Sequence, residues 1–243
     1  MHVALLADIH GNAVALDAVL SAVDEERPDE VVCLGDVAAT GPAPIDCLER
    51  IEALGCPVVA GNTDEWLLDP SLDEGEDESL QLLREIDAWC ADRLGPSHER
   101  VLESFASTVT LDLDDGTRMC GYHGSPRSHS DRIVATTPEP DLATWFAGID
   151  ATVMAGAHTH EQLFRRYEDR LVVNPGSVGL PHEYTRDGAV RHPPWAEWAM
   201  VSVEDGSTAV ELRRTPVDAD AVVERAETSD MPHADAWTDG WRK

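Results

Sequence analysis

Five short apolar runs along the chain end at side chains of the types that bind metal ions. In chain order these side chains are Asp8, His10, Asp36, Asn62, His123, His158 and His160. A buried parallel strand reads as a short apolar run, and open α/β sheets bind ligands just beyond the carboxyl ends of their strands. If the runs lie side by side, the seven side chains converge on one crevice. The sequence therefore predicts an α/β fold with a two-metal hydrolase site.

The length and hydrophobic content favour one large domain. A chain of 243 residues, 42% of them hydrophobic, can bury a proper core, and we predict that residues 1–243 form a single domain. No apolar run approaches the ~20 residues that span a bilayer, so no membrane partner is expected. The segment from Met1 lacks the basic start and cleavage site of a signal peptide, and none is expected.

The five cysteines are scattered, and no two of them form a Cys-x-x-Cys pair. Cys33 and Cys120 lie inside apolar runs, where a thiol usually acts as a small core residue. Because the number is odd and the spacing irregular, we expect neither a disulfide framework nor a thiolate zinc site. This pattern predicts a reducing, cytoplasmic setting.

The charge balance is strongly acidic. The chain carries 18 basic and 47 acidic residues, a net charge of −29, and its only lysine is Lys243. Self-repulsion at this charge destabilises a compact state in dilute buffer, whereas the Debye length falls to ~3 Å at 1 M salt. A single acidic run such as Glu74 to Glu78 reads as a solvated loop, but the overall bias resembles that of salt-in halophilic archaea. We therefore predict a protein that works in a salt-rich cytoplasm and binds no duplex nucleic acid stably, since it lacks a basic stripe.

Strands and helices alternate in the first part of the chain, as in a largely parallel sheet. Asn12 is predicted to cap a helix that stops before Pro28, and a second helix is predicted to end at Gly55. Residues 66–107 break this rhythm. They read as a small helical insertion, with a long helix over about 80–94.

The second half of the chain is rich in hairpin signals. The predicted turns are Asp114-Asp115-Gly116, Glu168-Asp169 and Asp205-Gly206. Pro138 predicts the start of a helix between the first two hairpins. Residues 195–243 are expected to form the last hairpin, a short helix near 218–227 and a polar tail.

Each metal-ligand motif has an ordinary alternative when it stands alone. Asp8-x-His10 directs two ligands to the same side of the chain, yet the pattern is common by chance. His158-x-His160 is a stronger signal, although histidine pairs also occur on surfaces. Gly35-Asp36 and Gly61-Asn62 could be ordinary turns, and His123 could be a hydrogen-bonded core histidine.

In combination, the motifs resemble those of the calcineurin-like metallophosphoesterase superfamily, above all its small prokaryotic phosphodiesterase branch. They are Asp8-x-His10, Gly35-Asp36 with Gly41-Pro42, Gly61-Asn62-x-Asp64, His123-Gly124, His158-x-His160 and Asn174-Pro175-Gly176-Ser177. The resemblance runs from residue 3 to about residue 180. It implies a four-layer αββα sandwich, in which two mixed β-sheets lie between layers of helices.

The resemblance also implies a pair of divalent ions held by seven side chains. Asp8, His10 and His160 would hold one ion, Asn62, His123 and His158 the other, and Asp36 would bridge them. An oxygen and imidazole shell without thiolate suits Mn²⁺, Fe²⁺, Ni²⁺ or Zn²⁺, of which Mn²⁺ is favoured here. In such a site a hydroxide between the metals attacks phosphorus in line.

Two positions depart from the family pattern. Phosphatases of the family commonly have histidine after Gly-Asn, where it can protonate the leaving group, but here that residue is Thr63. The general acid is therefore unassigned. Arg127 and His129 are the nearest polar candidates for substrate contact, with a plain surface loop as the alternative. Ala157 stands where the family usually has glycine, and it would be strained if that position required a positive φ.

The expected function is hydrolysis of a small phosphodiester or phosphomonoester. The alternative is a metal-free interaction scaffold on the same fold, like a retromer subunit of the family, although such a scaffold is expected to lose ligands. A Ser-His-Asp esterase is disfavoured because Ser177 lies in no Gly-x-Ser-x-Gly elbow. The sequence leaves the oligomeric state open, a homo-oligomer included. The remaining histidines are expected at the surface: His2, His98, His182, His192 and His233.

Overall fold

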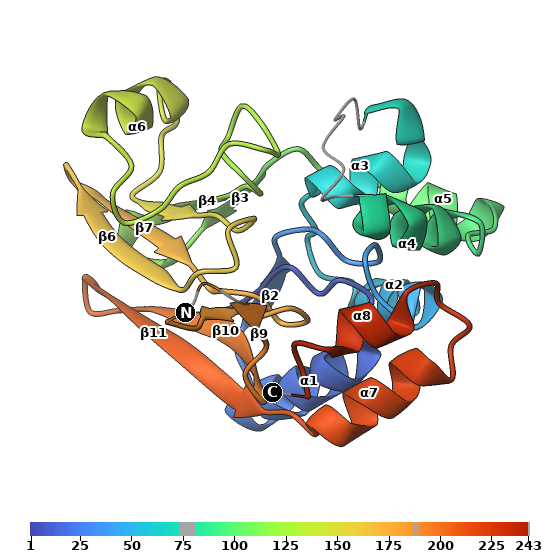
Figure 1. The fold of residues 1–243 in the computed structure, drawn as a ribbon. Coiled ribbons are helices and arrows are strands. Elements are labelled where there is room, and N and C mark those ends of the chain that lie inside the picture. Colours follow the sequence, from blue (N-terminus) through green and yellow to red (C-terminus); the bar gives the residue numbers. More distant parts are fainter. Residues whose placement is uncertain (73–80, 187, 189, 243) are drawn as a thin grey trace.

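Two mixed sheets face each other in the computed structural model, which describes residues 1–72, 81–186, 188 and 190–242 (Figure 1). The first sheet has the order β11-β10-β1-β2, with β1 parallel to β2 and antiparallel to β10. Its strands are β1 (His2–Leu6), β2 (Glu30–Cys33), β10 (Trp195–Glu204) and β11 (Ser207–Pro216). The acidic run Glu74 to Glu78 lies outside the described residues.

The second sheet has the order β3-β4-β5-β7-β6. Its three inner strands are parallel, and the edge strands β3 and β6 are antiparallel to their neighbours. The strands are β3 (Val109–Asp112), β4 (Arg118–Gly121), β5 (Val153–Ala155), β6 (Leu163–Tyr167) and β7 (Arg170–Asn174). The predicted turn between β3 and β4 is a short 3₁₀ segment, η3 (Asp114–Gly116). A small separate ribbon pairs β8 (Glu183–Tyr184) with β9 (Val190–Arg191).

Three apolar cores hold the layers together. The middle core joins the facing sheets through fully buried side chains such as Leu5 of β1 and Met119 of β4. On the outer face of the first sheet pack α1 (Ala13–Glu26) and α2 (Pro44–Leu54). On the outer face of the second lies α6 (Glu139–Trp145). The predicted αββα sandwich is confirmed.

The predicted helix boundaries are confirmed for α1 and α2. The Asn12 side chain accepts a hydrogen bond from the Ala15 backbone N–H at 3.1 Å, so it caps α1. Gly55 adopts the left-handed conformation that ends α2. Both helices present their apolar stripes to the first sheet.

The helical insertion begins earlier than expected. Its elements are α3 (Asn62–Leu68), η1 (Pro70–Leu72), α4 (Gln81–Ala91) and α5 (Pro96–Glu103). The run at Val58 forms no regular strand; it makes isolated parallel bridges from Val58 to Cys33 and from Val59 to Ala106. The chain thus turns into α3 directly beside β2, and Asn62 becomes the first residue of a helix. In Figure 1 the three helices lie together at one side of the sandwich.

The predicted polar tail is wrong in one respect, because part of it packs into the core. After α7 (Ala219–Glu227) the chain forms α8 (Ala234–Thr238). Trp237 and Trp241 are only 6% and 5% exposed, and the Trp237 indole donates a hydrogen bond to the Thr40 carbonyl at 2.7 Å. Among the described residues, no helix is long and apolar enough to cross a membrane.

Candidate metal centre

The loops that follow the strands run side by side and carry the candidate ligands. The Asp8 N–H donates to the Gly35 carbonyl at 3.0 Å, and the His10 N–H donates to the Asp36 carbonyl at 2.9 Å. On the second sheet, the Ala157 N–H donates to the His123 carbonyl at 2.8 Å. These bonds fix the loops after β1 and β2, and those after β4 and β5, as neighbouring pairs.

Glycine allows two of these loops to approach closely. A Cβ atom on Gly61 would lie 2.0 Å from Oδ1 of Asp36, far inside van der Waals contact. A Cβ on Gly35 would lie 2.6 Å from the Gly61 nitrogen. The glycines that precede Asp36 and Asn62 are therefore needed for the two candidate ligands to share one site.

One cluster is formed by Asp8, His10 and His160, which offer ligand atoms within 4.8 Å of one another. The Nε2 atoms of His10 and His160 lie 3.0 Å apart. Oδ1 of Asp8 lies 3.6 Å from Nε2 of His160, and this buried oxygen has no hydrogen-bond partner among the described residues. A buried carboxylate oxygen without a donor beside two ring nitrogens is a donor set that suits a cation.

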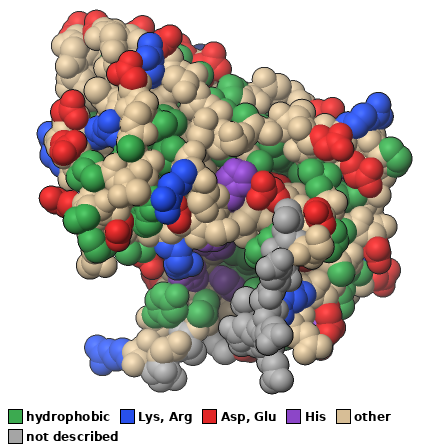
Figure 2. Space-filling view, turned by 90° about the horizontal axis from the view of Figure 1, so that it is seen from above, with side chains coloured by type: hydrophobic (Ala, Val, Ile, Leu, Met, Phe, Trp, Pro, Cys, Tyr) green, Lys and Arg blue, Asp and Glu red, His purple; other side chains and the backbone are tan. Residues whose placement is uncertain are grey.

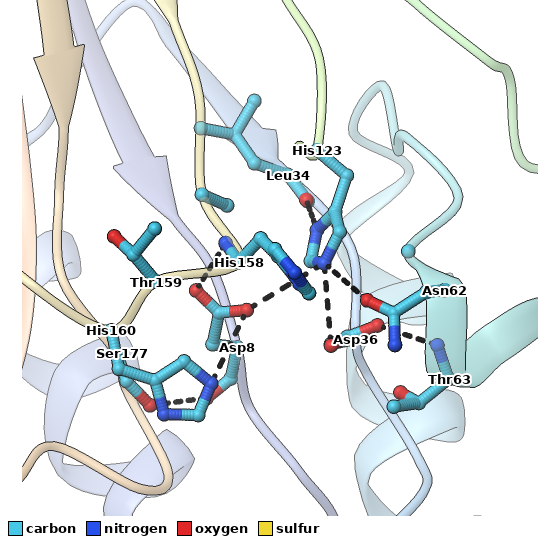
Figure 3. A network of polar contacts seen from close by, with 12 residues as sticks. Asp8, Leu34, Asp36, Asn62, Thr63, His123, His158, Thr159, His160 and Ser177 are labelled. Atoms are coloured by element: carbon cyan, nitrogen blue, oxygen red, sulfur yellow. Dashed lines mark hydrogen bonds and ion pairs between the residues drawn. The ribbon is translucent and has the colours of Figure 1, made fainter. Parts of the chain in front are cut away.

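The second cluster contains Asp36, His123 and His158, again with ligand atoms within 4.8 Å. Oδ1 of Asn62 lies 3.2 Å from Nε2 of His123 and adds an amide oxygen. Figure 3 shows these side chains pointing toward one another from separate segments of the chain. Figure 2 shows histidine side chains in a hollow on this face, with basic side chains at its edge.

The two clusters adjoin through their carboxylates. Oδ2 of Asp36 lies 3.6 Å from Nε2 of His10 and 3.3 Å from Nε2 of His123, so one oxygen faces a histidine of each cluster. Oδ1 of Asp8 similarly lies 3.9 Å from Nε2 of His123. The seven predicted side chains thus meet in one place.

Backbone carbonyls orient two of the imidazoles. Nδ1 of His123 lies 2.7 Å from the Leu34 carbonyl, and Nδ1 of His160 lies 2.8 Å from the Leu180 carbonyl. Each Nδ1 therefore carries the donated proton, which leaves Nε2 directed at the cluster. This outer hydrogen bond is typical of metal-binding histidines.

Burial and charge favour neutral imidazoles at three of the four positions. Burial lowers the pKa of His10 and His160, and it lowers the pKa of His158 to about 4. At His123 burial acts in the same direction, but the Asp36 and Asp8 carboxylates raise the pKa to about 10. A cation bound at Nε2 of His123 has to displace that proton.

The pKa values of the two carboxylates shift in opposite directions. Burial raises the pKa of Asp8 well above its usual range. Burial also opposes ionisation of Asp36, but the His123 ring, followed by His10, holds the pKa of Asp36 below its usual range. Positive charge at the centre therefore stabilises the ionised form of Asp36.

Asp64 ties the loops of the site together. Its carboxylate accepts hydrogen bonds from the backbone N–H groups of Asp36 at 2.8 Å, Val37 at 2.9 Å and Gly61 at 3.0 Å. The Thr63 N–H donates to Oδ1 of Asp36 at 3.0 Å, while the Thr63 hydroxyl is buried without a partner in the described structure. Asp64 is thus a positioning residue beneath the clusters.

The Asn174 to Ser177 loop supports the other side. The Asn174 amide donates to the Ala157 carbonyl at 2.8 Å, and the Ser177 hydroxyl donates to the Asp8 carbonyl at 2.7 Å. Ser177 also accepts from the Leu180 N–H at 2.8 Å, so its hydroxyl is fully engaged. The φ angle of Ala157 is not positive, so alanine is unstrained at this position.

The two predicted substrate contacts lie in different surroundings. The Arg127 guanidinium pairs with Asp131 at 3.1 Å and lies over the Trp145 ring. Nδ1 of His129 lies 2.9 Å from Oε2 of Glu65, on the helix that begins with Asn62. His129 thus contacts the helix that begins with Asn62, whereas Arg127 faces α6.

Sequence reasoning missed His182. It was expected at the surface, but its ring centroid lies 5.7 Å from that of His160, and the residue is half-buried. His192 is likewise half-buried, stacked on Trp241 at 5.2 Å. An isolated histidine after Leu180-Pro181 has no sequence spacing that links it to the ligands, so no pattern could have identified it.

Comparisons with known proteins identify the family and the fold of the chain. A profile of the calcineurin-like phosphoesterase superfamily domain matches residues 1–192. An uncharacterized protein of Methanocaldococcus jannaschii is 25% identical over 197 residues, which are 74% of this chain and 77% of that protein.

Solved structures share the fold. A metallophosphoesterase from Sphaerobacter thermophilus has a TM-score of 0.75 and 23% identity, and the match covers 100% of this chain and 99% of that one. A hypothetical protein from Pyrococcus horikoshii has a TM-score of 0.80 and 21% identity, with coverage of 95% and 94%. Likeness at these identities shows the fold, and the profile shows the family. The chain belongs to the calcineurin-like phosphoesterase superfamily, a family of metal-dependent hydrolases.

Proposed function

We propose that the protein is a dinuclear phosphoesterase that hydrolyses a small phosphodiester or phosphomonoester. The observation that carries this proposal is the position of Oδ2 of Asp36 between His10 of one cluster and His123 of the other. Two cations a few ångströms apart repel each other, and a shared carboxylate offsets that repulsion. A single-metal site would not need a carboxylate in this position.

The proposed ligands are those of the two clusters. Asp8, His10 and His160 would hold one ion, Asn62, His123 and His158 the other, with Asp36 shared. The imidazole and oxygen donors suit Mn²⁺, Fe²⁺, Ni²⁺ or Zn²⁺, and Mn²⁺ is our first choice for assays. The bound pair would supply an activated water at neutral pH and would neutralise charge that develops on the phosphoryl oxygens. It would also attract an anionic substrate to a protein with a net charge of −29.

The residues around the two clusters are proposed to position the substrate, and none of them is assigned to protonate the leaving group. Because Thr63 occupies the place of the usual acid, no histidine follows Asn62 to protonate a leaving group. This favours diesters whose leaving groups depart readily. His129, held by Glu65 at 2.9 Å, is the proposed substrate contact on the Asn62 side; Arg127 is the weaker candidate because Asp131 engages it.

A substrate panel tests the proposal. Phosphodiesters, nucleotides and phosphomonoesters are assayed with Mn²⁺ at low and high salt, for the wild type and for Asp36→Ala. The matched control is Asp112→Ala, which removes an exposed carboxylate paired with Arg118. We expect Mn²⁺-dependent hydrolysis in the wild type and the control, and a loss of at least about 100-fold in Asp36→Ala.

Two outcomes would contradict the proposal. Retained hydrolysis in Asp36→Ala would exclude a bridging role for this carboxylate. No hydrolysis in the wild type, together with no stoichiometric metal and no thermal stabilisation by Mn²⁺, would favour the metal-free scaffold instead. A cytoplasmic location is part of the proposal and rests on the five free cysteines.

A further inference from the structure

A series of rings leads outward from the metal centre. The His182 ring lies 5.7 Å from that of His160 and 5.1 Å from that of Tyr184, which it meets edge to face. His160 is a proposed metal ligand, so Tyr184 is separated from the centre by a single side chain. Below, His182 and Tyr184 are called the ring pair.

The outer end of this series is exposed apolar surface. Tyr184 is 64% exposed, and Val190, its register partner on β9, is 43% exposed. Exposed apolar side chains of this kind are free to pack against the apolar part of a ligand. A flat aromatic face beside a phosphate site suits the ring of a bound ester.

An unpaired arginine lies near the same edge. The Arg132 guanidinium makes no ion pair or hydrogen bond in the described part of the chain, although acidic residues outnumber basic ones 47 to 18. A Cβ atom on Gly124 would lie 2.6 Å from the Asp131 carbonyl oxygen, so the backbone just before Arg132 packs against the residue that follows the proposed ligand His123. From this position the Arg132 charge acts on both the His158 ring and the His182 ring, so Arg132 is close to a proposed ligand and to the ring pair.

The chain fixes Arg132 where it is. Ile133, the next residue, is 5% exposed and packs into the core beneath α6. The preceding loop is closed by the Ser125 hydroxyl, which donates to Asp131 at 2.6 Å. An anchored backbone on both sides lets an arginine reach a ligand with less loss of entropy than a free loop would allow.

We propose that Arg132 and the ring pair bind the organic part of the substrate, and that this substrate is a phosphate ester carrying an aromatic ring, such as a nucleotide. Arg132 pairs with a phosphoryl oxygen, while the aromatic group stacks on Tyr184. His182 holds Tyr184 in position against the centre. This inference rests on the proposed phosphoesterase function and names the class of ester that the site accepts.

Two ligands that differ only in the aromatic ring test the inference. Adenosine 5′-monophosphate and ribose 5-phosphate share the sugar and the phosphate, and only the first has a base. Their binding to the Mn²⁺-loaded protein is measured by calorimetry, and their inhibition of bis(4-nitrophenyl) phosphate hydrolysis is measured in parallel. Base stacking on an exposed aromatic ring predicts that the adenosine compound binds about tenfold more tightly.

Substitutions separate the two contacts. Tyr184→Ala removes the tenfold preference, whereas Tyr184→Phe keeps the ring and keeps the preference. Arg132→Gln weakens the binding of both ligands by a similar factor of about 10, and Arg132→Lys restores part of that affinity. The controls are Phe164→Ala and Arg166→Gln on β6, which remove an exposed ring and an exposed charge elsewhere and should change neither value.

The outcomes distinguish this inference from the proposed function. If the wild type hydrolyses the diester but Tyr184→Ala keeps the full preference, or Arg132→Gln binds both ligands normally, the inference is wrong and the phosphoesterase function stands. If the wild type hydrolyses no ester, the phosphoesterase function fails. Calorimetry then still decides whether the ring pair and Arg132 bind an aromatic phosphate.

Discussion

At the residue scale, the candidate ligands adopt backbone conformations that most residues avoid. Positive φ angles occur at Asp8 (52°), His10 (47°), Asp36 (54°), His158 (68°) and His160 (56°). Such conformations cost about 1–3 kcal/mol each and persist only where the surroundings enforce them. Here the paired loops and the Asp64 carboxylate supply that constraint. Their concentration at one place supports a functional centre independently of any motif.

The glycine before Asn62 provides a test that changes no ligand. In Gly61→Ala, the new Cβ would lie 2.0 Å from Oδ1 of Asp36 and displace that carboxylate. We predict at least about tenfold weaker Mn²⁺ binding, measured by calorimetry, because displaced supporting groups typically weaken metal sites by 10–100-fold.

Gly95→Ala is the matched control for Gly61→Ala. Both glycines are extended N-cap residues, of α3 and α5, so the capping change is the same. At Gly95 the nearest atom to an added Cβ is 3.9 Å away. This variant should keep wild-type Mn²⁺ affinity and lose at most about 1 kcal/mol of stability. Equal Mn²⁺ affinity in the two variants would contradict the role assigned to Gly61.

At the element scale, much of the fold could be predicted from apolar runs that end at the candidate ligands. Apolar runs predicted β1, β2, β4 and β5, and helical spacing with a cap predicted α1 and α2. The order of the strands within each sheet could not be read from such runs, since periodicity carries no information on which strands are neighbours. The centre was nevertheless predictable, because parallel strands end at the same edge of a sheet.

The elements that were missed are short. At seven residues, α3 is too brief to show an apolar period, and its N-cap is Gly61, which has no side chain that could accept a capping hydrogen bond. The five-residue helix α8 lies in a polar stretch of the sequence. Only the burial of Trp237 and Trp241 shows that this stretch is part of the core. Both are set by tertiary packing, which local sequence does not encode.

The contacts of His192 with the C-terminal segment predict that the stability of the protein depends on pH. Nδ1 of His192 donates to the Pro181 carbonyl at 2.8 Å, and the ring stacks on Trp241. Burial lowers the pKa of His192 in the folded protein, so below about pH 6.5 the unfolded chain binds the proton more strongly. The His192 contribution to stability is therefore complete above about pH 6.5 and is lost as the pH falls toward the folded pKa.

Replacing the imidazole should flatten this dependence. Urea unfolding at pH 7 and pH 5 is measured for the wild type and for His192→Gln. We expect the wild type to lose more unfolding free energy on acidification than the variant does. Because both proteins share every other titrating group, the difference isolates His192. Equal losses would show that this ring titrates alike in the folded and unfolded chains.

At the scale of the whole molecule, charge is the dominant feature. With a net charge of −29, repulsion acts over the entire surface, and the ion pairs of the described residues lie mostly at exposed positions. Exposed pairs contribute little stability. We propose that residues 1–243 form one domain that depends on screening by salt, as predicted from the sequence.

Salt should therefore stabilise the protein strongly. Raising KCl from 0.1 M to 2 M shortens the Debye length from about 10 Å to under about 3 Å. We predict a gain of at least about 2 kcal/mol, or roughly 4–8 °C in Tm, in a single unfolding transition followed by circular dichroism. A neutral osmolyte at equal osmolality is the control and should reproduce only part of the gain. Full stability without added salt would contradict the prediction.

The metal content of the protein tests the central claim most directly. The wild type and Asp36→Asn are loaded with Mn²⁺, freed of unbound ions by gel filtration and measured by inductively coupled plasma mass spectrometry. Seven converging side chains predict two ions per wild-type chain and no more than one in the variant. A wild-type chain that retains one ion or none would contradict a two-metal centre.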